Sequence, residues 1–103
     1  MYKLSFFVPQ QSLESVKAAL FKAGAGCIGN YDQCCWQIKG QGQFRPLSGS
    51  HPAIGEQGVL TVLEEWKVEL VCEDDVIEKA VHALKAAHPY EEVAYQVVKL
   101  ENI

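Results

Sequence analysis

The sequence has 103 residues, room for a single domain, since domains typically hold about 100–200 residues. Hydrophobic residues make up 49% and charged residues 21%, a globular composition that excludes global disorder. The formal net charge of −4 argues against binding nucleic acid by phosphate neutralisation, and no apolar run reaches the ~20 residues that span a bilayer. Because the N-terminus also lacks a signal-peptide pattern, we expect a cytoplasmic domain with reduced cysteines.

The first elements in chain order are a strand and a helix. Residues 3–8 alternate in polarity, which predicts a strand with one buried face. Residues 12–23 carry apolar side chains at helical spacing, with Ser12 as the expected N-cap and Gly24 as the expected end.

The middle of the chain predicts short strands followed by a long loop. Residues 27–31 and 35–39 each have the composition of a strand. Residues 40–58 hold five of the eight glycines, so we expect a loop there with special backbone demands.

The second half repeats the strand and helix. Residues 60–72 predict a strand of unusual length, with a bend or bulge near Glu64 and Glu65. Residues 75–87 predict a helix capped by Asp74 or Asp75 and ended by Pro89, and residues 93–100 predict a last strand.

The two halves of the chain align without a gap when Leu4 is placed on Val68, and Leu20 then falls on Leu84. Each half reads strand, helix, strand. The repeat therefore predicts one α+β domain over residues 1–103, a ferredoxin-like βαβ-βαβ sandwich with an antiparallel sheet and both helices on one face. Residues 32–60 are then an inserted hairpin and loop.

The face of this sheet that carries no helices is expected to be more apolar than an ordinary solvent-exposed surface. It would carry Phe7, Val71 and some of the residues among Val93, Tyr95 and Val97 or their neighbours. We expect another copy of the chain to cover part of this face, and the alternative is a scatter of surface hydrophobes.

The segment 88–92, with the sequence HPYEE, is the first candidate site. The side chains of His88, Glu91 and Glu92 could share one divalent metal ion, which His51 from the loop could join. The alternative is that this segment only shapes the corner between helix and strand, where a histidine suits the helix C-terminus.

The glycine-rich loop is the second candidate. Its backbone amides around Gly49, Gly55 and Glu56 could bind a small anion, and the alternative is a tight connection with positive φ at glycine. No nucleophile–base pair or spaced acid/base pair is evident, so we do not expect an enzyme.

The run GQFRPLSGSHPAIGEQG, followed by EEWKVELVC and AAHPYEEVAYQV, resembles the PII-like (CutA-like) domain inserted in YqfO-type members of the NGG-one-interacting-factor family. The resemblance covers residues 3–100, with Val93 where the motif often has proline. It implies a ferredoxin-like fold of the PII/CutA kind, which typically assembles as trimers. It does not imply the dinuclear-metal hydrolase chemistry attributed to the parent family, whose ligands lie in the flanking domain, and it carries over no ligand residue.

These observations lead to the expectation of a small homo-oligomeric binding or regulatory module, with a trimer favoured, that senses a divalent metal ion or a small anion. The alternatives are a structural oligomerisation domain without a ligand and a metal-dependent hydrolase. The sequence names no protein partner.

Overall fold

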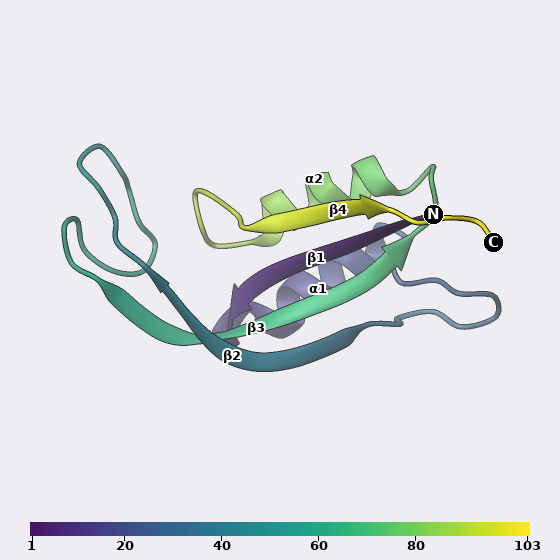
Figure 1. The fold of residues 1–103 in the computed structure, drawn as a ribbon, viewed down its shortest axis with the longest axis horizontal. Helices are drawn as coiled ribbons and strands as arrows, with labels where there is room; N and C mark the ends of the chain where they lie inside the picture. Colours follow the sequence, from purple (N-terminus) through teal and green to yellow (C-terminus); the bar gives the residue numbers. More distant parts are fainter.

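The computed structural model describes residues 1–103 and contains four strands and two α-helices (Figure 1). In chain order the elements are β1 (Tyr2–Pro9), a 3₁₀ turn η1 (Gln10–Ser12), α1 (Leu13–Lys22), β2 (Trp36–Phe44), β3 (Thr61–Cys72), α2 (Ile77–Ala87) and β4 (Tyr95–Lys99). The strands form one antiparallel sheet in the order β2-β3-β1-β4. This order and the βαββαβ sequence of elements confirm the ferredoxin-like α+β prediction.

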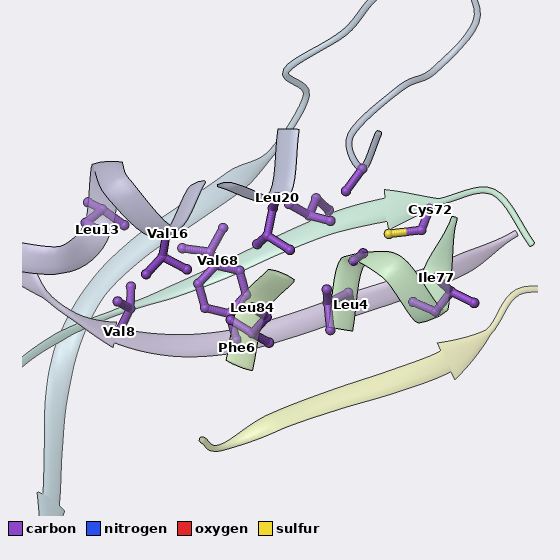
Figure 2. Close-up of a cluster of buried hydrophobic side chains, with 13 residues drawn as sticks. Leu4, Phe6, Val8, Leu13, Val16, Leu20, Val68, Cys72, Ile77 and Leu84 are labelled. Atoms are coloured by element: carbon purple, nitrogen blue, oxygen red, sulfur yellow. The ribbon is translucent and has the colours of Figure 1, made fainter. Parts of the chain in front are cut away.

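The hydrophobic core lies between the sheet and the two helices (Figure 2). The alternation predicted for β1 is confirmed, because Leu4, Phe6 and Val8 are fully buried. The helices contribute Leu13, Val16 and Leu20 from α1 and Ile77, Ala80 and Leu84 from α2, which are the stripes expected at 3.6-residue spacing. Each large side chain buried here stabilises the fold by about 1.5–3 kcal/mol.

The helix ends follow the predicted stop residues, and Ser12 is the N-cap residue of α1 as predicted, although its side chain forms no capping hydrogen bond. Gly24 has a φ of 101°, the left-handed conformation that ends α1, and His88 is extended before Pro89, which ends α2. At the start of α2 the N-cap is Val76, so the predicted aspartate cap is wrong. Asp74 instead pairs with the N-terminal amine and with Lys99, which joins the start of α2 to β1 and β4.

The segment after α1 is the main difference from the expected element boundaries. Residues 27–31 form only an isolated bridge between Ile28 and Tyr31, and β2 begins at Trp36. The alignment of the two halves places Tyr95, the first residue of β4, on Tyr31, which belongs to no strand. The repeat therefore holds for the first strand and helix of each half but not for the second strand.

Strand β2 continues to Phe44, so residues 40–44 belong to a strand and not to the predicted loop. Its register with β3 is unbroken from Trp36 opposite Glu69 to Phe44 opposite Thr61. The predicted bulge is therefore absent, and the long β2–β3 hairpin instead curves along its length (Figure 1). Only residues 45–60 remain as the loop between these strands.

The face of the sheet away from the helices combines polar and apolar side chains. Phe7 and Val98 lie on it, with Trp36 and Ile38 on the outer strand β2. Lys3, Ser5, Lys67 and Glu69 occupy its centre. Tyr95 lies on the helix side, where Lys85 approaches its ring at 5.2 Å. Neither α-helix has the length and apolar character that a membrane crossing requires.

Candidate functional site

The two segments selected from the sequence meet at one end of the molecule. Figure 1 shows the loop after β2 and the turn between α2 and β4 at the same end of the sheet, opposite the two chain termini. Between them lies a pocket of about 640 Å³. Its walls come from the loop around residues 43–54, from the turn around residues 90–94, and from Phe7 and Glu65 in the sheet.

Tyr90 connects the two walls. Its ring centroid is 5.8 Å from that of Phe44 at the end of β2, and its hydroxyl donates a hydrogen bond of 2.8 Å to Glu65 Oε2 on β3. Burial raises the pKa of the Tyr90 hydroxyl, and the hydrogen bond to Glu65 and that residue's charge raise it further. The phenol therefore remains protonated and keeps donating to the carboxylate.

A second link comes from the backbone of the loop. The amide N–H of His51 donates to Glu91 Oε1 at 3.0 Å. Of the residues predicted for a metal site, the structure thus brings His51 and Glu91 together, but the contact uses the backbone of His51 and not its imidazole.

His88 is buried behind the pocket, with 6% of its surface exposed. Its Nδ1 accepts a hydrogen bond of 3.1 Å from the amide of Tyr90, so Nδ1 carries no proton. Nε2 must then carry the proton and donates to the carbonyl of Phe7 at 2.7 Å. Burial lowers the pKa of His88, although the hydrogen bond to Phe7 and the charge of Glu65 act in the opposite direction.

This geometry does not support the predicted metal set of His51, His88, Glu91 and Glu92. Both ring nitrogens of His88 already serve the backbone, so His88 would have to lose a hydrogen bond to bind a metal ion. The chain contains no group of three or more His, Cys, Asp or Glu side chains placed to hold a metal ion.

Only one of the three loop residues predicted for an anion site lies at the pocket. Gly49, which has a φ of 95°, lines the pocket, as do Glu91 and Glu92, whereas Gly55 and Glu56 do not. Gly55 has a structural role, because its φ is 94° and a Cβ there would lie 2.5 Å from the hydroxyl of Thr61.

Sequence reasoning missed two residues that line the pocket. Phe7 and Glu65 lie in strands, where alternation marks them only as residues of the outer face. Gly42 lay inside the selected loop, but its contact with the opposite strand could not be predicted: a Cβ there would be 2.6 Å from the Glu65 carboxyl carbon and would overlap Oε1. Phe44 and Tyr90 lay inside the selected segments, and their aromatic rings were the available signal.

Comparison with known proteins gives relatives that extend well beyond this chain. No family model matches the sequence. The chain is 45% identical over 102 residues to a GTP cyclohydrolase 1 type 2 homolog from Halalkalibacterium halodurans, a match that covers 99% of this chain and 27% of that protein. The chain spans about a quarter of the length of the curated relatives it matches.

Comparison with solved structures identifies the fold. A Bacillus cereus protein related to NIF3 superposes with a TM-score of 0.82 at 40% identity, over 98% of this chain and 26% of that one. CutA1 from Pyrococcus horikoshii superposes with a TM-score of 0.70 at 17% identity, over 100% of this chain and 86% of that one. The chain therefore has the CutA fold and is similar in sequence to about a quarter of a NIF3-related protein and of GTP cyclohydrolase 1 type 2 homologs.

Proposed function

We propose that this chain is a small-molecule-binding domain and that its ligand occupies the pocket between the loop at 43–54 and the turn at 90–94. The observation that carries the proposal is the convergence of these two segments around about 640 Å³, a volume typical of ligand sites. The lining combines apolar and aromatic side chains with a few charged groups, which is the usual composition of such a site.

An organic molecule suits this pocket better than a metal ion. The ring nitrogens of His88 are engaged by the backbone, and Glu91 accepts a backbone amide. Phe44 and Tyr90 offer ring surface against which the apolar body of an organic ligand can pack.

The test is a fragment screen followed by NMR of the ¹⁵N-labelled chain. Binding fragments should shift amide signals of residues 43–54 and 90–94. The variant Leu47→Ala removes an exposed side chain that lines the pocket and should weaken binding, whereas Leu60→Ala, similarly exposed but outside the pocket, should not. The proposal fails if no fragment shifts these signals, or if the two variants weaken binding alike.

A second candidate is a structural role in self-association. Trp36 and Ile38 are 57% and 51% exposed on the outer strand β2, whose free edge is open to further pairing. Together with the resemblance to trimeric PII/CutA domains, this supports a homo-oligomer, with three copies favoured.

Sedimentation velocity at micromolar concentration tests this role. We expect a mass of several chains, which Trp36→Lys lowers and which Val62→Lys, exposed on the opposite face of the hairpin, leaves unchanged. The mass of a single chain for the unmodified protein would contradict it.

A further inference from the structure

The charge of the pocket limits what it can bind. Three carboxylates line it, from Glu65, Glu91 and Glu92, against one guanidinium, that of Arg45. None of these four groups forms a salt bridge, since the acidic partners in the ion pairs of this chain are Glu14, Glu64, Glu69 and Asp74. The pocket therefore keeps an excess of negative charge that the chain itself does not neutralise.

Two of the carboxylates are held in place with acceptor capacity left over. Glu65 uses Oε2 to accept from Tyr90 and packs against Gly42, and its Oε1 has no hydrogen-bond partner in the chain. Glu91 uses Oε1 to accept from His51, which leaves its Oε2 free. A carboxylate fixed in this way is prepared to accept from a ligand at little cost in side-chain entropy.

Aromatic rings surround these carboxylates. Phe7, Phe44 and Tyr90 all line the pocket, and the face of an aromatic ring attracts a cation. The chain's own cation–π contacts lie elsewhere, with Lys85 over Tyr95 and Lys99 over Tyr2. The pocket rings are thus not occupied by a lysine or arginine of this chain.

We propose that the pocket binds an organic cation, an ammonium or guanidinium group carried on an apolar or aromatic body. The cationic group would be held by the Glu65 and Glu91 carboxylates and the body by the three rings. A small anion is disfavoured because it would meet three carboxylates and one guanidinium. This inference rests on the proposed ligand-binding function and specifies the chemistry of the ligand.

Three probes of the same shape test the inference by NMR titration at pH 7. They are 2-phenylethylamine, 2-phenylethanol and 3-phenylpropionate, which share the ring and the two-carbon arm and differ in charge. We expect the amine to bind about tenfold more tightly than the alcohol, and the carboxylate to bind more weakly than either.

A pair of adjacent variants supplies the control. Glu65→Gln removes a pocket charge and retains an acceptor for Tyr90, and it should weaken amine binding severalfold while leaving the alcohol unchanged. Glu64→Gln removes a charge from the opposite face of β3, where Glu64 pairs with Lys39, and should leave both unchanged.

Three results would overturn the inference. If the alcohol or the carboxylate binds as tightly as the amine, with shifts at residues 43–54 and 90–94, the pocket binds ligands but does not select cations. If Glu64→Gln and Glu65→Gln weaken amine binding equally, the effect is one of overall charge. If none of the three probes binds at millimolar concentration, the cation inference fails, whereas the fragment screen and its leucine variants decide separately whether the pocket binds ligands at all.

Discussion

The contact between Gly42 and Glu65 allows a sharp test of how the pocket is built. Replacing Gly42 by alanine adds a Cβ where the Glu65 carboxylate lies, so the carboxylate has to move. We expect the displaced carboxylate to lose its hydrogen bond from the Tyr90 hydroxyl, which is 2.8 Å long in the unmodified chain. Gly40→Ala is the matched control, because it lies two residues away on the same strand and face, and a Cβ there meets nothing within 4 Å.

The expected change in the free energy of unfolding caused by Gly42→Ala follows from two terms. A hydrogen bond to a charged group contributes about 1.5–3 kcal/mol, and the partial exposure of Tyr90 and Glu65 favours the lower end. Alanine stabilises a strand by about 0.5–1 kcal/mol relative to glycine. Gly42→Ala should therefore destabilise the fold by about 1 kcal/mol, which lowers Tm by roughly 4–8 °C in a domain of this size, while Gly40→Ala should raise Tm by a few degrees.

Thermal and urea unfolding followed by circular dichroism give the free energies. A double-mutant cycle with Tyr90→Phe then isolates the hydrogen bond, because in that background Gly42→Ala has no bond left to break. We expect Gly42→Ala to cost nothing there and to stabilise the fold by about 0.5–1 kcal/mol, as Gly40→Ala does. The reasoning is refuted if Gly42→Ala is as benign as Gly40→Ala, or if its cost is the same with phenylalanine at position 90.

Three further predictions concern the core and the titrating groups. Burial lowers the pKa of His88 in the folded state below its ordinary 6.5, so the unfolded chain takes up a proton first as the pH falls, and the free energy of unfolding should decrease as the pH drops through about 6.5. In urea unfolding at several pH values, His88→Gln should show a shallower decrease. The same dependence of stability on pH in both proteins would contradict this. Leu84→Ala empties a fully buried position and should cost about 2–5 kcal/mol in the same assay, whereas a cost below about 1 kcal/mol would show that the core closes over the gap. Burial raises the pKa of the Cys72 thiol to about 11, so in the folded protein at pH 8 Cys72 should react with Ellman's reagent far more slowly than exposed Cys27. Equal reaction rates in the Cys27→Ser and Cys72→Ser variants would contradict this prediction.

The hydrophobic periodicity of short stretches was enough to predict that helices pack on one face of a sheet in this protein. The period-2 alternation of β1 and the 3.6-residue stripes of α1 and α2 are properties of short stretches, and they identified the core residues. The internal repeat then led to the ferredoxin-like order, because each half carries one strand and one helix at matching places. The end of β2 was not predicted, since Gly40 and Gly42 look like loop residues until the strand opposite them is known.

The pocket depends on contacts that no local pattern contains. The HPYEE segment and the glycine-rich loop could be selected as candidates from composition, but their meeting depends on the curvature of the β2–β3 hairpin (Figure 1). Packing likewise decides the role of His88. The sequence predicted that its imidazole binds a metal ion, whereas in the fold its two ring nitrogens form hydrogen bonds with the Phe7 carbonyl and the Tyr90 amide. A ring nitrogen in a buried place bonds to whichever partner the surrounding backbone presents, and that partner is set by strands and turns far away in the sequence.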